Sequence, residues 1–230
     1  MSSICIIPAR GGSKRIPRKN IKNFHGIPII AYSIKTALDS GLFNEVMVST
    51  DDKEIAEISK KNGAVVPFYR SKTTSNDFAG IPDVLVEVIT KYISMGREFD
   101  SICCILPTAP FLTKIHLIES YSDFIANDFD TLIPIVKFSY PILRSFSLVN
   151  GKVRMNWPEN YSKRSQDLEP AYHDAGMFYW LKQHKFLSNP LIFSGNSGAY
   201  ELEESIVQDI DSEEDWKVAE FKYNYLKGRQ

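Results

Sequence analysis

Apolar runs alternate with amphipathic segments along the first two thirds of the chain. The runs are short and almost continuously apolar, as buried strands are; they cover residues 4–7, 46–50, 101–106 and 131–138, with a weaker run at 65–68. Between them, apolar side chains recur every three or four positions, which predicts helices over residues 29–40, 52–62, 81–95 and 113–127. This alternation predicts an α/β fold with a mainly parallel sheet and helices on both faces.

The pattern changes after residue 140. Residues 146–155 predict a β-hairpin that turns at Asn150-Gly151, a strong hairpin signal. Residues 159–174 are polar and irregular. We therefore expect residues 140–174 to form a small insertion that leaves the main sheet.

The last part of the chain returns to regular structure. An aromatic-rich strand is expected at 177–181, followed by the end of a strand at 205–211. A helix then runs to about Lys227. Asp211 and Glu214 are spaced like the N-cap and N3 residues of that helix, so we expect it to begin at Asp211.

The composition limits the class of protein. A chain of 230 residues with 43% hydrophobic content is typical of one globular domain, here residues 1–230. The net charge of −1 argues against a nucleic-acid partner. No apolar run is long enough to span a membrane, and no secretory signal is seen. The three cysteines lie in expected buried strands, which is typical of free thiols in a reducing compartment, so we expect a cytoplasmic protein.

The first predicted strand runs into a loop with an unusual concentration of positive charge. Gly11 and Gly12 lie among five cations, which are Arg10, Lys14, Arg15, Arg18 and Lys19. Glycines let backbone N–H groups approach a ligand closely, and open α/β sheets bind ligands at the carboxyl ends of their strands. The loop therefore predicts a nucleoside triphosphate site, although its spacing matches neither a P-loop nor a dinucleotide-binding loop. The alternative is a solvated basic turn.

A pair of carboxylates precedes the last helix. Asp209 and Asp211 are two positions apart, so in an extended segment they face the same side. Mg²⁺ favours one or two carboxylates together with phosphate oxygens and water. Beside a triphosphate loop the pair predicts a magnesium site; taken alone, it is more simply part of a solvated acidic stretch.

A polar cluster follows the expected hairpin. Its members are Arg164, Gln166, Asp167, Tyr172, His173 and Asp174. An arginine at this position can pair bidentately with a substrate carboxylate. His173 beside Asp174 suggests acid–base chemistry, but adjacent residues on a strand face opposite ways, which argues against a dyad.

Other strand ends carry fewer signals. Asp52 is most simply the N-cap of the helix that follows it, whereas Asp51 ends its strand near any ligand. Thr108 lies in an otherwise apolar turn after the central strand, which suits a partly apolar, hydroxylated ligand. The aromatic run that begins at Phe178 is more typical of a core than of a site.

Five motifs occur in an order that resembles the acylneuraminate cytidylyltransferases, and they span nearly the whole chain. They are IPARGGSKRIPRKN, STDD, PTAPF, RSQDLEPAYHDAG and QDID. Such enzymes activate nine-carbon α-keto sugar acids as CMP conjugates. The chain resembles the pseudaminic acid branch most, because Arg15, Leu106 and the sequence Asp174-Ala175-Gly176 depart from residues usual in the sialic acid branch.

The resemblance implies a Rossmann-like nucleotidyltransferase fold with an inserted dimerisation subdomain, CTP as a substrate and Mg²⁺ as the cofactor. It implies that the nucleotide is bound by Ala9, Arg10, Gly11, Ser13, Lys14, Lys19, Asn20, Ser75 and Asp77. It implies that the sugar acid is bound by Thr108, Arg164, Gln166, Tyr172, His173, Asp174 and Phe178. Asp209 and Asp211 would bind the metal, and Arg10, Lys14 and Asp211 would be catalytic.

The expected reaction is an in-line attack of the anomeric hydroxyl of the sugar acid on the α-phosphate of CTP, with release of pyrophosphate. The insertion is expected to form a homodimer and to lend Arg164 or a neighbour to the partner's site. Alternatives are a synthetase for CMP-sialic or CMP-legionaminic acid and, in another class, a non-catalytic nucleotide- or RNA-binding module. Among partners we expect small-molecule substrates, and neither nucleic acid nor a membrane.

Overall fold

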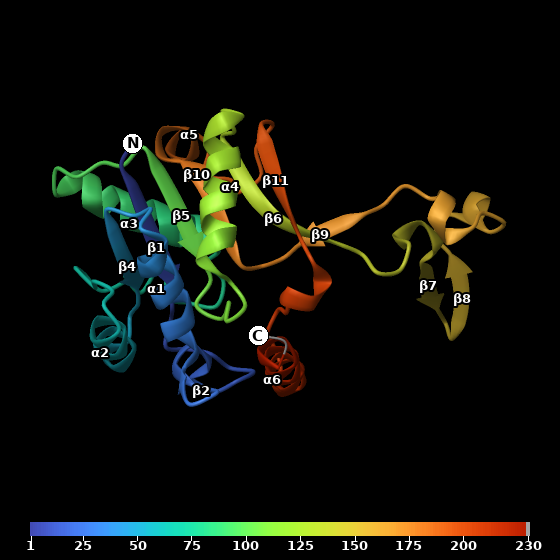
Figure 1. Cartoon of the computed structure of the whole chain (residues 1–230), viewed down its shortest axis with the longest axis horizontal. Helices are drawn as coiled ribbons and strands as arrows, with labels where there is room; N and C mark the ends of the chain where they lie inside the picture. Colours follow the sequence, from blue (N-terminus) through green and yellow to red (C-terminus); the bar gives the residue numbers. More distant parts are fainter. Residues whose placement is uncertain (229–230) are drawn as a thin grey trace.

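A seven-stranded sheet forms the centre of the protein in a computed structural model that describes residues 1–228. Its strands are β1 (Ser3–Pro8), β4 (Glu45–Ser49), β5 (Ser101–Ile105), β6 (Thr131–Lys137), β9 (Tyr172–Asp174), β10 (Phe178–Lys182) and β11 (Ser197–Leu202). Their order is β11-β6-β10-β5-β1-β4, with β9 paired to β6 (Figure 1). Neighbouring strands are parallel with two exceptions. β10 runs antiparallel to both of its neighbours, β5 and β6, and β9 runs antiparallel to β6.

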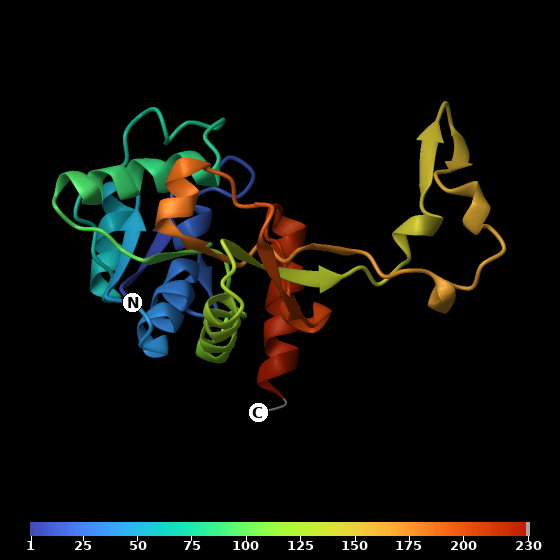
Figure 2. The same cartoon turned by 90° about the horizontal axis from the view of Figure 1, so that it is seen from above.

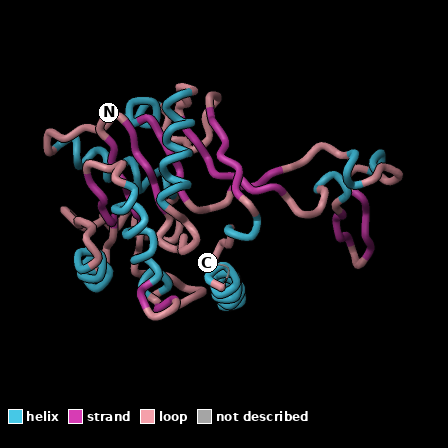
Figure 3. The backbone as a smooth tube through the Cα atoms, in the orientation of Figure 1, coloured by secondary structure: helices cyan, strands magenta, loops and turns pink. Residues whose placement is uncertain are grey.

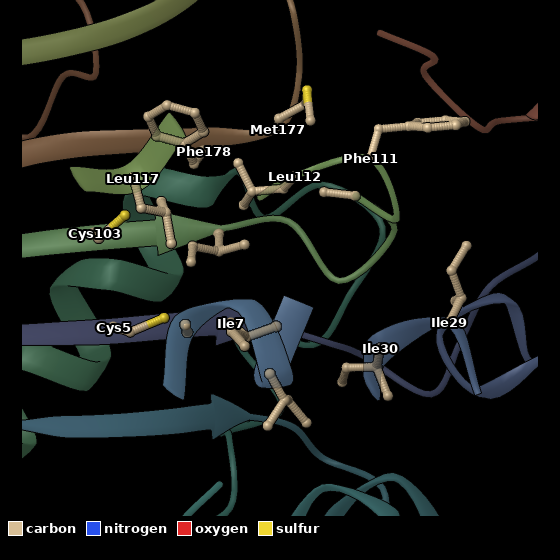
Figure 4. Close-up of a cluster of buried hydrophobic side chains, with 14 of the residues drawn as sticks. Cys5, Ile7, Ile29, Ile30, Cys103, Phe111, Leu112, Leu117, Met177 and Phe178 are labelled. Atoms are coloured by element: carbon tan, nitrogen blue, oxygen red, sulfur yellow. The ribbon is translucent and has the colours of Figure 1, made fainter. Parts of the chain in front are cut away.

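Helices cover both faces of the sheet, as the sequence predicts. They are α1 (Ile29–Ser40), α2 (Lys53–Lys61), α3 (Ile81–Ser94), α4 (Lys114–Ala126), α5 (Gln183–Ser188) and α6 (Glu213–Lys227). On one face, Cys5 and Cys103 pack with Leu117 of α4, in the cluster of Figure 4. On the other face, Cys104 packs with Val88 of α3. Alternate side chains of the strands therefore feed two separate cores.

Polar side chains set the starts of two helices. Asp52 caps α2, because its carboxylate accepts a hydrogen bond from the Ile55 N–H at 3.0 Å, as expected. The start of α6 differs from the expectation at Asp211. Its N-cap is Ser212, whose hydroxyl accepts from the Asp215 N–H at 3.2 Å while the Asp215 carboxylate accepts from Ser212. The capping residues are thus displaced by one position from Asp211 and Glu214, which leaves Asp211 outside the helix.

Two expected strands are absent from the described residues, and five strands or α-helices were not anticipated. The run at 65–68 contributes only an isolated bridge between Met47 and Val65. Residues 205–211 hold no strand; the strand in that part of the chain is β11, which comes earlier. The unanticipated elements are β2 (Asn23–Phe24), β3 (Ile27–Pro28), β9, α5 and β11. The strands β2, β3 and β9 have only two or three residues, and β9 lacks buried side chains, so periodicity gave no signal for it.

Residues 139–171, which we call the arm, extend away from the sheet (Figures 1 and 2). The arm contains the expected hairpin of β7 (Phe146–Val149) and β8 (Lys152–Met155). Its turn has positive φ at Asn150 (50°) and Gly151 (76°), the backbone that this dipeptide favours. Loops and short 3-10 turns connect the hairpin to the sheet (Figure 3). The chain re-enters the sheet at β9, so Tyr172–Asp174 belong to the sheet.

Three smaller features complete the fold. Asn23–Phe24 (β2) and Ile27–Pro28 (β3) form a separate two-stranded sheet beside α6. Cys5, Cys103 and Cys104 are free thiols and are buried, as expected. Among the helices of residues 1–228, none has the length and apolar character that a membrane span needs.

Candidate active site

A cavity of about 540 Å³, which we call the pocket, lies at the carboxyl ends of β1 and β5. It is enclosed by the loop after β1, the turn after β5, the segment before α6, and the segment that leads into α3. Its lining residues are Pro8, Arg10, Ser13, Lys14, Arg15, Lys19, Asn20, Arg70, Asp77, Ala79, Gly80, Ile81, Val84, Leu106, Pro107, Thr108, Asp209 and Asp211. The pocket is therefore at the edge of the sheet where α/β folds bind ligands.

Many of the expected site residues meet in this pocket. They are Arg10, Ser13, Lys14, Lys19, Asn20, Asp77, Thr108, Asp209 and Asp211. They come from four stretches of chain that are far apart in sequence. The basic loop and the carboxylate pair thus face one cavity.

The loop after β1 is held in shape by backbone contacts with its neighbours. The Gly11 N–H donates to the Asp51 carboxylate at 2.9 Å, and the Asn20 side-chain amide donates to the Arg10 carbonyl at 2.9 Å. A Cβ on Gly11 would lie 2.8 Å from Asp52 Oδ2, whereas a Cβ on Gly12 would meet nothing within 4 Å. Only the first glycine is therefore required by a close approach.

Four cations of the loop line the pocket, and each is paired with a carboxylate from another segment of the pocket lining. Arg10 lies 2.7 Å from Asp77 Oδ1, and Lys14 pairs with the other oxygen of Asp77. These two cations, Lys14 first, lower the pKa of Asp77. Across the pocket, Arg15 lies 2.8 Å and Lys19 3.4 Å from Asp211 Oδ1.

The fifth cation has a different place. Arg18 adopts a left-handed backbone (φ 56°) and turns away from the pocket. Its guanidinium lies 2.6 Å from both Asp52 Oδ2 and Glu54 Oε2, at the start of α2. It therefore ties the loop to the N-terminus of α2. Only four of the five cations that the sequence predicted for the triphosphate site line the pocket.

The two carboxylates of the 208–211 motif lie at the other end of the pocket. Lys19 spans the distance to them, because its Nζ donates to the Ile210 carbonyl at 2.6 Å. Helix α6 fixes the motif from behind: Trp216 packs edge-on against Phe24 at 5.6 Å between ring centroids, and Lys22 Nζ lies 2.6 Å from Glu213 Oε2. The N-terminal and C-terminal parts of the chain are thus locked together at this site.

Asp209 and Asp211 both line the pocket, and they are the carboxylates there that could hold a divalent cation together. Burial, and next the charge of Asp211, raise the pKa of Asp209, and a cation bound beside Asp209 would offset this effect. Within residues 1–228, no group of three or more His, Cys, Asp or Glu side chains could hold a metal ion. The remaining ligands would have to be phosphate oxygens and water, which is the set that Mg²⁺ favours.

Arg70 lines the pocket although sequence reasoning missed it. Its side chain is almost completely buried, and its guanidinium donates to the Ser49 carbonyl at 2.6 Å and to the Ser49 hydroxyl at 3.2 Å. Burial lowers its pKa to about 10, so it remains charged at neutral pH. A single arginine in an irregular stretch carries no sequence signal, because only the fold brings it beside β4.

Two expected sugar-binding residues lie in the arm, away from the pocket. Arg164 and Gln166 are exposed there, and the Arg164 guanidinium lies 2.7 Å from Asp167 Oδ2. Within one chain neither residue contacts the pocket lining, because the arm extends away from the sheet.

Apart from Thr108, which lines the pocket, the other expected sugar-binding residues lie on β9 and β10 and do not line it. Tyr172 and His173 are on β9, and the His173 ring contacts the backbone carbonyl of Asp174 rather than its carboxylate. The Asp174 carboxylate accepts from the Tyr179 hydroxyl at 2.7 Å and from the Gly176 N–H at 2.8 Å. Phe178 is fully buried in the core, which leaves it no surface for a ligand.

Three expected nucleotide-binding residues do not line the pocket. Ala9 is fully buried behind the loop, and Gly11 is engaged with Asp51 through its backbone. The Ser75 hydroxyl donates to the Ser71 carbonyl at 2.7 Å, so it shapes its own segment.

The chain is similar in sequence to several known cytidylyltransferases. The chain is 45% identical over 224 residues to a pseudaminic acid cytidylyltransferase of Campylobacter jejuni, and the match covers 97% of each protein. It is 35% identical over 219 residues to N-acylneuraminate cytidylyltransferase A of Danio rerio, covering 94% of this chain and 49% of that protein.

The fold has counterparts among solved structures. The structure of CMP:2-keto-3-deoxy-manno-octonic acid synthetase complexed with CTP superposes with a TM-score of 0.70 at 16% identity, covering 98% of this chain and 99% of the other. At that identity the likeness concerns the fold alone. A family model described as cytidylyltransferase matches residues 4–214. Since that match spans most of the chain, the protein belongs to the cytidylyltransferase family, as its motifs predict.

Proposed function

We propose that the protein transfers CMP from CTP to pseudaminic acid and releases pyrophosphate. The observation that carries the proposal is the pocket itself, in which basic residues face a carboxylate pair across a single cavity. The sugar is inferred from similarity, because the identity to a pseudaminic acid cytidylyltransferase is 45%, against 35% for an N-acylneuraminate enzyme.

In this proposal the triphosphate lies along the loop after β1. Arg10 and Lys14 would bind phosphate oxygens, and their present pairing with Asp77 supports this because a carboxylate occupies the same donors. Asn20 would hold the loop backbone in place through the Arg10 carbonyl. Ser13 contributes a hydroxyl donor on the same wall.

Asp209 and Asp211 would hold Mg²⁺ together with the phosphates. When bound, the ion would neutralise charge on the reacting phosphate. Lys19 lies beside the pair, and its positive charge would reduce the repulsion between the two carboxylates.

The chemistry follows from positioning and charge. The anomeric oxygen of the sugar acid forms a bond to the α-phosphorus while the bond from that phosphorus to the bridging oxygen of pyrophosphate breaks. The hydroxyl proton would pass to Asp211 or to a water that Asp211 orients. Arg10 and Lys14 would stabilise the charge that develops on the phosphates.

The sugar acid would lie beside Thr108 and Leu106, with further contacts from a partner subunit. We propose that the protein is a single domain, residues 1–230, whose insertion at about 140–174 forms a homodimer. Support comes from the hairpin of the arm, where Leu148 and Val153 are 75% and 72% exposed and face each other across the two strands. A homodimer would explain how Arg164 and Gln166 reach a pocket. We also propose a cytoplasmic location, which free buried thiols support.

Two alternatives can be tested against this function. Another nonulosonic acid, sialic or legionaminic, would use the same pocket with a different sugar. A non-catalytic nucleotide- or RNA-binding module would need the basic loop but no carboxylate pair, so the pair argues against it.

The test is pyrophosphate release from CTP and Mg²⁺ with pseudaminic acid or N-acetylneuraminic acid. We expect turnover with pseudaminic acid, and a loss of about a thousand-fold in Asp211→Ala. Glu214→Ala, in the first turn of α6, is the matched control and should keep wild-type activity. Turnover with N-acetylneuraminic acid instead would move the protein to the sialic acid branch. Release with neither sugar would contradict the proposed reaction.

A further inference from the structure

Residues 69–80, which we call the wall segment, form one side of the pocket without any helix or strand. Arg70, Asp77, Ala79 and Gly80 all line the cavity. An irregular segment keeps a fixed shape only if side chains hold it, because its own backbone hydrogen bonds are few. The contacts that hold the wall segment therefore decide where its lining residues stand.

Glu87 of α3 holds the first part of the wall segment. Its carboxylate accepts from the Ser71 N–H at 2.8 Å and from the Ser71 hydroxyl at 2.8 Å, and it also accepts from the Thr74 hydroxyl. The Glu87 side chain is only 14% exposed. Burial tends to raise its pKa, but the hydrogen bonds from Lys91, Thr74 and Ser71 outweigh burial and lower the pKa to about 2. Glu87 is therefore charged at neutral pH and engaged on both oxygens.

Lys91, one turn further along α3, completes this anchor. Its Nζ donates to Glu87 Oε1 at 2.6 Å and to the Tyr69 carbonyl at 3.0 Å. Tyr69 and Ser71 flank Arg70 in the chain. The Glu87–Lys91 pair thus grips the backbone on both sides of the buried arginine of the pocket.

Glu87 acts from outside the pocket. Helix α3 turns Ile81 and Val84 to the pocket, whereas Glu87 and Lys91 line a separate hollow with Ser71 and Thr74. Glu87 therefore touches the wall segment and does not line the cavity where a substrate would lie.

The far end of the wall segment is held differently. Arg10 donates to the Asn76 carbonyl at 2.8 Å and pairs with Asp77. Arg10 is one of the cations that we propose for the triphosphate, so this contact competes with the nucleotide. The anchor at Glu87 uses no group that a nucleotide would need, and it can persist when CTP binds.

We propose that Glu87 is a positioning residue for the nucleotide site, which fixes the wall segment beside Arg70 through Ser71 and Thr74. The inference rests on the proposed function, because it assumes that CTP occupies the pocket. Glu87 itself takes no part in the chemistry. Its removal should therefore weaken nucleotide binding and leave the chemical step largely intact.

The test compares Glu87→Ala, Glu87→Gln and the exchange Glu87→Lys with Lys91→Glu. We expect Glu87→Ala to raise the Kd and KM for CTP about ten-fold, since charged hydrogen bonds are lost. The kcat and the KM for the sugar acid should stay near wild-type values. Glu87→Gln should lie between, because its amide oxygen still accepts from Ser71 or Thr74.

The exchange variant separates two explanations. It restores an ion pair within α3 but removes the acceptor beside Ser71, so we expect it to bind CTP no better than Glu87→Ala. The matched control is Asp39→Ala, which removes another ion pair at i and i+4, between Lys35 Nζ and Asp39 Oδ2 at 3.1 Å on α1. The control should bind CTP like the wild type.

Hydrogen exchange at the Ser71 amide gives a readout that does not depend on CTP. Exchange should be faster in Glu87→Ala, with the core strands unchanged. Normal CTP affinity in folded Glu87→Ala, or recovery in the exchange variant, would show that the inference is wrong. A wild-type protein that binds no CTP would instead overturn the proposed function, and the role of Glu87 with it.

Discussion

The loop after β1 and the arm differ in where their side chains find partners. In the loop, Asn20 is buried, and Arg18 and Lys19 are engaged by carboxylates of the same chain. In the arm, Asn160 is the one buried residue of 139–171, and apolar side chains of the hairpin are open to solvent. The polar side chains of the loop find their partners within one chain, whereas the arm exposes apolar surface that a monomeric protein usually buries.

The difference teaches which residues can be assigned from a single chain. Polar residues of the loop point to the pocket or brace it, so a role can be read from their contacts. Arg164 and Gln166 of the arm have no such relation to the pocket, so no role for them can be read from the contacts of one chain.

The largest effect is expected from substitutions in the hairpin of the arm, which we propose as the surface for self-association. Leu148 lies opposite Val153, and Phe146 opposite Met155, so one face of the hairpin is apolar. The double variant Leu148→Asp with Val153→Asp should weaken self-association about a hundred-fold, since buried charge is costly at an interface. Sedimentation over a range of concentrations measures it.

Arg154→Asp is the control for this prediction, because Arg154 pairs with Ser147 on the other face of the hairpin. It should leave association unchanged. A wild-type protein that sediments as a monomer at every concentration would contradict the proposed homodimer.

The loop should be sensitive at one glycine and tolerant at the next. Gly11→Ala would place a methyl group 2.8 Å from Asp52 Oδ2 and 3.0 Å from Asp52 Cβ, so the loop has to shift. We expect CTP binding about ten-fold weaker, because overpacking costs on this order. Gly12→Ala, with open space around the new methyl group, should bind CTP like the wild type. Equal effects of both substitutions would contradict the close approach.

Removing the anion that competes for the loop should strengthen binding. Asp77 pairs with Arg10 and Lys14 at exposed positions, so the pair is weak and nucleotide phosphates compete with it. Asp77→Asn should tighten CTP binding by about two- to five-fold, measured by calorimetry. Asp39→Asn changes the net charge equally on α1 and should have no effect. Weaker binding in Asp77→Asn would instead support the contact between Asp77 and the nucleotide that the family resemblance implies.

The smallest effect concerns stability in acid. A hydrogen bond from Arg18, above all, lowers the pKa of Asp52 from 3.8 to about 2. The stability from this pair is complete above the unfolded pKa near 3.8 and is lost as the pH falls towards 2. Asp52→Asn keeps a capping group and should be about 1 kcal/mol less stable at pH 7, with the difference shrinking below about pH 4. Denaturant unfolding from pH 7 to 2.5 measures it; a constant difference would contradict the linkage.

The elements of the sheet and its covering helices were largely predictable. Strands such as β1 and β5 are buried on both faces, which writes an apolar run into the sequence, and α3 carries its apolar stripe at helical spacing. The strand predicted at 65–68 does not form, because this run pairs with β4 through a single bridge only. β9 was missed because it is short and exposed, so its pairing with β6 depends on position and not on pattern.

The candidate site was predictable only in part. Clusters of unusual charge gave the loop and the pair of Asp209 and Asp211, since a local surplus of like charge needs an explanation. The same surplus of positive charge led us to expect Arg18 in the site, but Arg18 pairs with Asp52 at the start of α2. Arg70 and Glu87 gave no clue, because one isolated charged residue is compatible with any exposed position.

Local patterns in the chain were enough to predict the α/β class, the hairpin of the arm, the basic loop and the acidic pair, because each depends on neighbours within a few positions. The remaining features depend on the folded protein. It brought residues 10, 70, 108 and 211 to one cavity, gave β10 its antiparallel place between β5 and β6, and separated the arm from the pocket. These outcomes depend on contacts between residues far apart in the chain, whose pairing is settled by packing of the whole core and not by local pattern.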